Sequence, residues 1–582
     1  NKWAYKITGE YSSGKEYFFY DSVYVTKYPP YDSSVSERNV DFDFRHIRGE
    51  AHVYYSVTPK TDIIVSGGGS NNNFLQVTTG GRNQMRGVTY SFLQARLVNP
   101  HYYVNVYNTW GNLGTSYPIA PYTRDFWNRT HRPNNPLRPE IAEDSALQNF
   151  QFKEESQRLN ADAQYNYDFK KTGLFLIAGL NYQKEKPNGF GRTLVDKNER
   201  IYVTQYGSVL QLEKLLPLRI RFIGAVRYDH HSNFGNFYSP KLGLVKVIGD
   251  GSFRVTWGRA YAMPTILHQY GNLQNNTFGN GEGITYMPNG FNFYKPASIK
   301  TIAPLKPEEV RTWEFGYKGT FAKKLFVDIN YYNGQSKNFL GTSKPVLGRI
   351  VLVGDQEVSQ ANPGSIGQDS ILRNAQFLTY FNYSAVKAYG IDVGLTYSFN
   401  KFISIGINYS WFGSDITDDD MKNDANGDGY VSLEETSLNA PNHRGFISLS
   451  LENLCKQRLF LNISARIVQQ YDFYSGFQIG TEAGEGKRGK VPWGIAPNGQ
   501  PRYYPKNFDW GPLGGFTTID LSAGYKVNEM ISVNTGITNL FDTEQIEFVG
   551  SPSIGRLIMF ELKVHVPNSG KKCNKFLISY GN

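Results

Sequence analysis

The sequence predicts an all-β fold, a large antiparallel transmembrane β-barrel of about 20–22 strands with long extracellular loops. Three observations predict it. Segments of about ten residues alternate between apolar and small or polar side chains, as in a strand with one face toward lipid. No apolar run approaches the length of a membrane-spanning helix. Short turns also alternate with long loops along the chain, as they do in membrane barrels.

The stretch 402–411, FISIGINYSW, shows the repeating unit most clearly. Ile405, Ile407 and Tyr409 fall on one face of an extended strand, and the residues between them are small or polar. The stretch ends at Trp411, and Tyr and Trp prefer the boundary between membrane and water. A chain that repeats this unit some twenty times would close into a barrel.

Composition agrees with a barrel and narrows the possible partners. Hydrophobic residues make up only 40% of the 582 residues, because barrel strands hide their hydrophobicity in alternation. Only two cysteines occur, Cys455 and Cys573, so no disulfide framework is expected. The net charge is +10, but the Lys and Arg residues are scattered, so nucleic acid is not an expected partner. A basic lumen that attracts anionic ligands is favoured instead.

The N-terminal third is predicted to contain strands joined by short turns, at 3–11 with 15–25, at 46–57 with 61–67, and at 85–98 with 102–110. Ser12-Ser13-Gly14 is the expected first turn, since Ser and Gly are turn residues. Residues 111–155 are rich in Pro, Asn and Arg and show little alternation. This segment is predicted to be a long loop.

The middle of the chain resumes the pattern, with expected strands at 156–169, 174–183, 218–228, 253–257, 310–321 and 325–335. Arg219, Arg221 and Arg227 share one face of the 218–228 strand. A charge at the centre of a lipid-facing surface costs roughly 2–4 kcal/mol, so these arginines are expected to point into the barrel. Residues 261–306 are predicted to form a second long loop.

The C-terminal part alternates most regularly, with expected strands at 402–411, 447–451, 459–467, 519–525, 531–537 and 556–566. Residues 472–515 form a third predicted long loop. We therefore expect residues 1–566 to make one barrel and residues 567–582, which continue no alternation, to be an irregular tail.

One loop motif predicts a metal site. Residues 424–435 fit the calcium-loop pattern D-x-[DN]-x-[DN]-G-x5-E in every position. The predicted Ca²⁺ ligands are Asp424, Asn426, Asp428, Tyr430 through its carbonyl, Ser432 and Glu435. No helical pair is expected beside it, so it would be an EF-hand-like loop set between strands. The alternation of short turns and long loops places it outside, so the ion would be structural rather than a sensor's. The alternative is an acidic, glycine-rich turn that merely stays soluble.

The histidines and the known catalytic motifs give no sign of an enzyme, whereas the loops contain candidate ligand-binding residues. His230 and His231 are adjacent, so on a strand they point to opposite faces. No GxSxG, HExxH or phosphate-binding loop motif occurs, and an enzyme is not expected. Loop aromatics could stack on flat ligands or sugar rings, and arginines could bind carboxylate or phosphate. The candidates are Arg124, Trp127, Arg129, Arg132, Trp493, Tyr503, Tyr504 and Trp510. Packing between loops and interfacial anchoring are the alternative roles.

Several stretches resemble one membrane family. They are SPKLGL at 239–244, FRVTWGRAYAMPT at 253–265, LKPEEVRTWEFGYKGTFAKKLFVDINYYNGQSKNF at 305–339, LNAPNHR at 438–444 and VNTGITNLFD at 533–542. In this order and spacing they resemble the barrel of TonB-dependent outer-membrane transporters.

The resemblance implies a 22-strand barrel around a plug in the bacterial outer membrane. It also implies import of a scarce ligand, driven by the inner-membrane proton gradient through TonB. In the family the plug and TonB box precede the barrel, and Asn1 already begins a strand pattern, so we expect the plug to lie outside this sequence. The expected partners are outer-membrane lipid, the TonB complex through that plug, and a small-molecule or glycan ligand; a surface lipoprotein is a further candidate.

A ferric siderophore or an oligosaccharide is the expected ligand. Three alternatives stay open on the sequence: a passive porin, a structural outer-membrane barrel, and a secreted all-β carbohydrate-binding protein. A plug encoded upstream would separate the importer from the porin.

Overall fold

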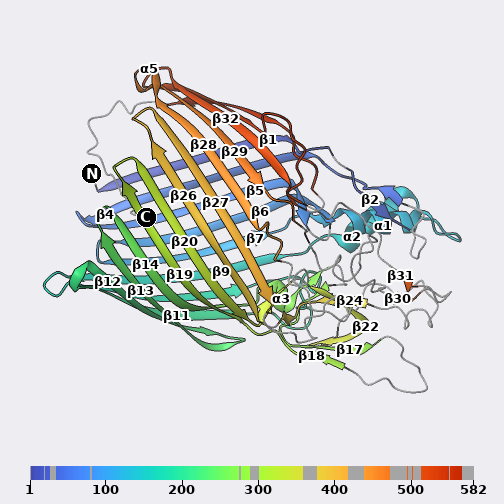
Figure 1. Cartoon of the computed structure of the whole chain (residues 1–582). Helices are drawn as coiled ribbons and strands as arrows, with labels where there is room; N and C mark the ends of the chain where they lie inside the picture. Colours follow the sequence, from blue (N-terminus) through green and yellow to red (C-terminus); the bar gives the residue numbers. More distant parts are fainter. Residues whose placement is uncertain are drawn as a thin grey trace.

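A computed structural model describes residues 2–18, 20–25, 34–78, 81–273, 277–288, 300–341, 343–357, 376–383, 385–416, 438–471, 473, 494–495, 501–502, 513–548 and 551–565. Within these residues, one sheet of 21 strands forms the wall of the molecule. Figure 1 shows this sheet rolled up, with its blue N-terminal strands behind the green and orange strands. The predicted barrel is confirmed.

The wall is an antiparallel meander in which each long strand pairs with the next long strand of the chain. The short β8 (Tyr117–Pro118) adds to β6. The long strands are β1 (Trp3–Lys15), β4 (Asp43–Thr58), β5 (Thr61–Thr78), β6 (Gly81–Val98), β7 (Tyr102–Asn112), β9 (Glu155–Phe169), β10 (Leu174–Lys186), β11 (Val203–Leu216), β12 (Ile220–His231), β13 (Gly235–Ile248), β14 (Gly251–Ala262), β19 (Glu308–Phe321), β20 (Leu325–Lys337), β26 (Val386–Ser398), β27 (Ile403–Ile416), β28 (His443–Asn453), β29 (Leu459–Val468), β32 (Phe516–Lys526), β33 (Ile531–Thr538) and β34 (Leu557–Val564).

The register collects apolar side chains on one face of this sheet. Ile407 of β27 lies opposite Leu395 of β26 and Ile447 of β28. Ile447 in turn lies opposite Ala465 of β29. These side chains stay exposed, 39% for Ile407 and 44% for Ile447, so this face buries little within the protein. It is the face that a bilayer would cover.

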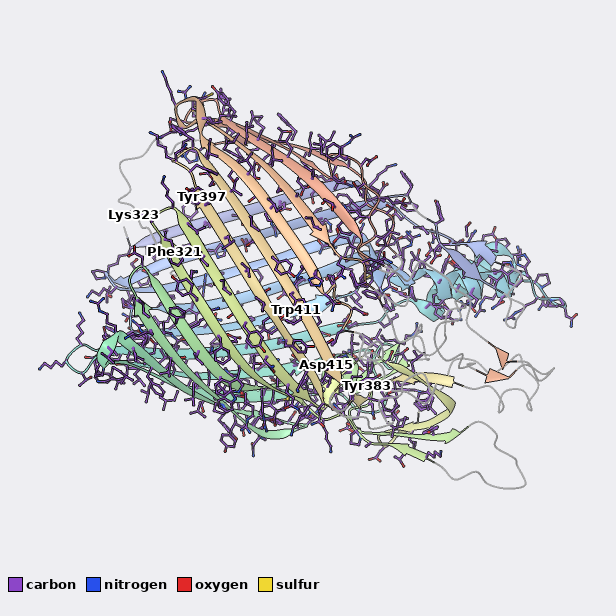
Figure 2. The ribbon with its side chains drawn as sticks, in the orientation of Figure 1. Phe321, Lys323, Tyr383, Tyr397, Trp411 and Asp415 are labelled. Carbon is purple, nitrogen blue, oxygen red and sulfur yellow. The ribbon has the colours of Figure 1, made fainter. Side chains whose placement is uncertain are left out.

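Aromatic side chains mark two levels of the apolar face. Tyr397 packs edge-on against Phe399 at 4.8 Å near the short turns. Tyr389 packs against Trp411 at 5.6 Å closer to the long loops. Figure 2 shows Tyr397 and Trp411 at these two levels of the wall. Aromatic girdles at both interfaces are characteristic of membrane barrels, because Tyr and Trp have one apolar and one polar end.

The opposite face of the wall is polar. Arg227 of β12 donates to Asn181 of β10 at 2.8 Å and to Asp229 at 2.6 Å. Arg221 donates to Glu213 of β11 at 3.1 Å. The predicted inward direction of Arg221 and Arg227 is therefore confirmed. Arg219 is different, because it lies in the short 3₁₀ turn η1 (Pro217–Arg219) between two strands.

The connections alternate as predicted. Tight turns such as Pro59-Lys60 and 322–324 join strands at one end of the wall. The described helices and short strands between long strands gather at the other end, to the right in Figure 1, apart from η1 and α5 (Leu454–Gln457) at the tight turns. This second end is the one that the sequence assigns to the outside. In the described residues, no helix has both the length and the apolar character needed to span a membrane.

The first predicted hairpin is wrong. Ser12, Ser13 and Gly14 do not turn but continue β1, opposite His46, Arg45 and Phe44 of β4. The neighbouring strand supplies hydrogen-bond partners for this extended backbone, and this tertiary pairing overrides the local turn preference of Ser and Gly. Of the expected strand 15–25, only β2 (Ser22–Tyr24) is a separate strand.

The long loops contain ordered elements. They are β3 (Ser34–Ser36), α1 (Ile119–Thr130), α2 (Pro139–Phe150), α3 (Ile266–Tyr270), β15 (Asn272–Leu273), β16 (Thr277–Phe278), β17 (Ile284–Pro288), β18 (Lys300–Ile302), β21 (Phe339–Leu340), β22 (Lys344–Val353), β23 (Gln356–Glu357), β24 (Gln376–Thr379), β25 (Asn382–Tyr383), β30 (Gly494–Ile495) and β31 (Pro501–Arg502). The predicted loop 111–155 thus contains two helices. A helical signal was present there: Pro139 begins α2, and the buried Ala142 and Ala146 are one turn apart.

Candidate ligand-binding end of the barrel

Two assemblies cover the loop end of the wall. The first, here the helical assembly, contains β2, β3, β8, α1 and α2. The second, here the loop sheet, has the strand order β15-β16-β24-β22-β17-β18, with β23 added to β22. Figure 1 shows both beyond the same end of the wall. Both assemblies therefore lie at the end from which a ligand outside the cell would approach the barrel.

A small apolar core holds the helical assembly together. Tyr117, Ile119, Tyr122 and Ala146 are fully buried in it. The rings of Tyr117 and Tyr122 lie 4.9 Å apart, and the Tyr117 hydroxyl donates to the Asn39 carbonyl at 2.9 Å. Burial raises the pKa of Tyr117 to about 12 and also raises that of Tyr122. Both phenols are therefore neutral at physiological pH and serve packing rather than proton transfer.

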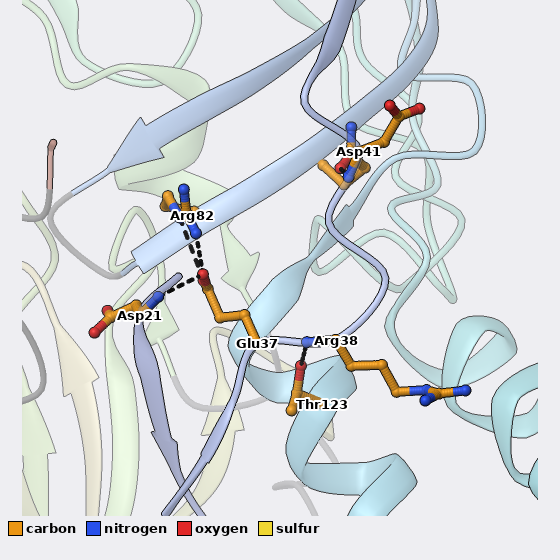
Figure 3. A network of polar contacts seen from close by, with 7 residues as sticks. Asp21, Glu37, Arg38, Asp41, Arg82 and Thr123 are labelled. Atoms are coloured by element: carbon orange, nitrogen blue, oxygen red, sulfur yellow. Dashed lines mark hydrogen bonds and ion pairs between the residues drawn. The ribbon is translucent and has the colours of Figure 1, made fainter. Parts of the chain in front are cut away.

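A buried ion pair ties this assembly to the wall. The guanidinium of Arg82 on β6 contacts the carboxylate of Glu37, and the two side chains are only 3% and 2% exposed. The same carboxylate accepts a hydrogen bond from the backbone N–H of Asp21 at 3.0 Å (Figure 3). The next residue, Arg38, donates its backbone N–H to Thr123 of α1 at 3.0 Å. One short segment therefore joins β6, the β2 region and α1.

Arg38 also bridges the two helices. Its guanidinium lies 3.9 Å from the centre of the Phe126 ring on α1. It makes an ion pair of 2.9 Å with Glu143 on α2. A cation over an aromatic face that also has a carboxylate partner is a stable arrangement at a partly exposed site. Arg38 therefore holds α1 against α2.

Three predicted ligand-binding residues, Arg124, Trp127 and Arg129, lie on α1. Arg129 donates to Asp125 at 2.7 Å, and Trp127 stacks on His131 with ring centres 4.4 Å apart. Arg124 is exposed. The structure thus brings the three onto one helix, and the partners of Trp127 and Arg129 within this assembly support the packing alternative for these two.

The turn between the helices carries Arg132, which the sequence analysis named as a candidate, and Arg138, which it did not. Arg132 and Arg138 are both exposed on either side of this turn. No acidic side chain in the described residues pairs with either of them. The sequence carried no signal for this pair of guanidinium groups, because the tertiary structure decides whether an arginine has an acidic partner.

The other predicted site residues cannot be placed. Trp493, Tyr503, Tyr504 and Trp510 lie outside the described residues, as does the predicted calcium loop with Asp424, Asn426, Asp428, Tyr430, Ser432 and Glu435. Their roles stay predictions, and so does the tail at 567–582. Within the described part of the chain, no group of three or more His, Cys, Asp or Glu side chains could hold a metal ion.

The loop sheet has its own core, of Val195, Phe278, Ile284, Ile350, Val353 and Phe377. Asn280 holds two of its segments together. Its side-chain amide is fully buried and donates to the carbonyls of Ala303 at 2.9 Å and Tyr380 at 3.1 Å. A buried amide needs such partners, since leaving it unpaired costs about 1–3 kcal/mol.

Ionisable groups at the edge of the loop sheet have shifted pKa values. Burial raises the pKa of Tyr270 to about 12, with the Glu282 charge contributing. Burial, followed by the charges of Glu199 and Asp355, raises the pKa of Glu282. Burial also lowers the pKa of His268. Its ring packs against the Tyr380 ring, with ring centres 4.6 Å apart. These groups belong to the packing of the loop sheet, and their arrangement offers no nucleophile with a general base.

The comparisons with known proteins agree with this architecture. A family model described as TonB dependent receptor-like, beta-barrel, matches residues 3–540. No curated protein matches the chain.

Among solved structures, a mutant of the ferric enterobactin receptor PfeA from Pseudomonas aeruginosa is similar with 13% identity and a TM-score of 0.62, over 97% of this chain and 75% of the other. The FrpB iron transporter from Neisseria meningitidis is similar with 12% identity and a TM-score of 0.60, over 96% and 76%. The copper transporter OprC is similar with 13% identity and a TM-score of 0.58, over 96% and 75%.

At these identities the solved structures establish the fold and no more. The family model covers nearly the whole meander, from the beginning of β1 to beyond β33. The wall, with its apolar outer face, polar inner face and loops at one end, is what that family requires. This chain therefore belongs to the TonB-dependent receptor family, whose members are transporters of the bacterial outer membrane and not enzymes.

Proposed function

We propose that this receptor imports an anionic small ligand through TonB, with a ferric siderophore as the first candidate. Family membership favours an importer over the passive porin, the structural barrel and the secreted protein that the sequence left open. The titles of similar solved structures name siderophore receptors and a copper transporter, and those ligands suggest a metal chelate here. A surface lipoprotein partner stays a proposal.

The exposed arginines of the helical assembly carry this proposal. Arg132 and Arg138 flank the turn beyond α1, and neither has an acidic partner in the described residues. A guanidinium presents a planar set of donors that matches carboxylate and other paired oxygen groups. Ferric chelates of the catecholate and carboxylate types offer such oxygens and carry negative charge. Two free guanidinium groups at the turn of the helical hairpin, beyond the loop end of the wall, would attract such a ligand from outside.

An oligosaccharide is the second candidate. Sugar rings need exposed aromatic faces, and the described candidate Trp127 already stacks on His131. The remaining aromatic candidates, Trp493, Tyr503, Tyr504 and Trp510, lie outside the described residues. The oligosaccharide therefore has less support than the anionic chelate, although the loop aromatics keep it open.

Binding in detergent tests the ligand class. We expect a ferric tris-catecholate chelate to quench the tryptophan fluorescence of the purified protein saturably. In Arg132→Gln/Arg138→Gln, its affinity should fall at least about tenfold at low salt, because two charge-assisted contacts are lost. Lys323→Gln, at the opposite end of the wall (Figure 2), is the matched control and should bind as wild type does. Equal affinity in the double variant would rule out these arginines, and tight binding of neutral maltohexaose instead would favour the sugar.

Transport is tested in cells that express the gene encoding this chain. Uptake of the same chelate, labelled with radioactive iron, should stop when the proton gradient is collapsed or TonB is deleted. Uptake that persists without TonB would identify a passive pore.

A further inference from the structure

A cleft of about 490 Å³ opens where β6, β7, β9 and β10 reach the loop end of the wall. Trp110 of β7, Gln157 of β9 and Lys186 of β10 line it. The segment that follows β10 covers one side, with Arg200 and Tyr202. The cleft is separate from the helical assembly and from the loop sheet.

The register places this cleft on the lipid side of the wall. Four of its residues are cross-strand neighbours and so share one face of the sheet. Lys186 of β10 pairs with Gln157 of β9, Gln157 pairs with Trp110 of β7, and Trp110 pairs with Ser91 of β6. Leu93 lies two residues from Ser91 along β6, so it points to the same face, and it is 56% exposed. On β10 the same face continues through Tyr182 to Leu180, which is 65% exposed. The cleft is therefore the upper continuation of the apolar surface that the bilayer covers.

The cleft carries excess positive charge. Neither Lys186 nor Arg200 has an ion-pair partner in the part of the chain that the structure describes. Lys184, one step lower on the same face, lies 5.7 Å from the centre of the Tyr202 ring. The acid in the lining, Glu155, accepts a hydrogen bond from Asn112 at 3.3 Å. An anion that enters the cleft would meet two unpaired cations and one carboxylate, so the charged lining residues still favour an anion.

We propose that this cleft binds the phosphorylated headgroup of a glycolipid in the outer leaflet of the membrane. Basic side chains beside a lipid-covered surface bind anionic headgroups, and Trp and Tyr side chains sit at the headgroup level. Trp110 and Tyr202 give the cleft aromatic walls at this level, and Lys186 and Arg200 provide the charge. A soluble ligand on its way into the lumen would not pass this outward-facing site, so the proposal is independent of the imported ligand.

Lipid retention tests the proposal. The purified protein, exchanged into mild detergent, is incubated with diphosphoryl lipid A and examined by native mass spectrometry. We expect wild type to retain one lipid, and Lys186→Gln/Arg200→Gln to retain it roughly 10- to 30-fold less well, the loss expected for two surface cations. Heat-dependent migration on gels shows whether the variant is folded.

Three controls make the test decisive. Lys214→Gln/Lys246→Gln removes two basic residues on the same face at the opposite end of the wall and should retain lipid as wild type does. The dephosphorylated lipid should be retained poorly by all proteins. Equal retention by the folded cleft variant and wild type, or equal retention of the dephosphorylated lipid, would overturn the proposal. Displacement of the lipid by equimolar inorganic phosphate would also overturn it, because the site would then recognise free phosphate.

Discussion

The wall and the loop end of this receptor are stabilised in different ways. In the wall, the inner strands of the meander pair with a neighbour on each side, and side chains divide into an apolar outer face and a polar inner face. At the loop end, small cores combine with buried polar side chains such as Arg82, Gln84 and Asn280. The wall depends on a repeated pattern, whereas the loop end depends on individual contacts.

This difference decides how each region tolerates substitution. In the wall, the consequence of a new side chain depends on the face it occupies, because one face meets lipid and the other meets polar groups. At the loop end, it depends on whether a buried polar group keeps its partner. Four predictions test this contrast, beginning with the largest effect.

The largest effect is expected at the buried ion pair. Arg82→Met leaves the Glu37 carboxylate buried beside an apolar chain, which should destabilise the helical assembly locally by about 3–5 kcal/mol. Hydrogen exchange followed by mass spectrometry should show at least about 100-fold faster exchange in β2 and α1, with unchanged exchange in β27. The double variant Arg82→Met/Glu37→Gln, which removes both charges and keeps an acceptor for Asp21, should recover most of the protection. Slow exchange in the single variant would show that the pair is not needed for docking.

A charge on the lipid face should have the next largest effect. Ile447→Arg places a cation among Ile407 and Ala465 on the apolar face and should cost about 2–4 kcal/mol in urea unfolding from lipid bilayers. Ser448→Arg, one residue along, projects from the polar face beside Gly406 and Ser464 and is the matched control. We expect it to cost less than about 1 kcal/mol. Similar losses in the two variants would contradict the assignment of the faces.

The predicted calcium loop tests whether some loops need an ion that the wall does not. Isothermal titration should show saturable Ca²⁺ binding, and Asp428→Ala should weaken it at least about tenfold, because one of the oxygen ligands is removed. Chelation should leave the melting temperature of the wall unchanged while exposing 424–435 to protease. Unchanged Ca²⁺ binding in Asp428→Ala would show that the motif is only an acidic turn.

The smallest effect is expected from pH. Burial and neighbouring acids raise the pKa of Glu282 above its ordinary value of 4.5 in the folded loop sheet, so the folded state holds this proton more tightly than the unfolded state. The loop sheet should therefore gain stability as pH falls through the raised pKa toward 4.5, and Glu282→Gln should be more stable than wild type at pH 7. Because the Glu282 side chain, although crowded by neighbouring groups, still has much of its surface in contact with water, the difference should stay below about 1 kcal/mol. Thermal melts should show this stability difference between Glu282→Gln and wild type at pH 7 but not at pH 4. A larger difference at pH 4 would contradict the raised pKa of Glu282.

The sequence could predict most of the wall because its signal is local. Alternation in 402–411 fixes the face of each side chain, and the cost of a charge in lipid fixes the direction of Arg221 and Arg227. The failure at Ser12-Ser13-Gly14 has the same origin, since a local turn preference gave way to pairing with β4, whose partner residues lie 30 to 34 positions along the chain. The candidate site fared less well. The sequence singled out Arg124, Trp127 and Arg129. It did not predict that Arg129 would pair with Asp125 or that Trp127 would stack on His131, because the helix that brings these residues together was expected to be a loop.

By itself, then, the sequence determined the barrel, its two faces and its family, because side-chain period and lipid exposure act on each strand separately. Only the tertiary structure decided which residues of different segments lie together: Arg82 contacts Glu37, Asn280 donates to the Tyr380 carbonyl, and Lys186 and Arg200 line one cleft with Trp110. These residues belong to segments separated by loops. The residue pattern within one segment does not show which residue of another segment will lie beside it.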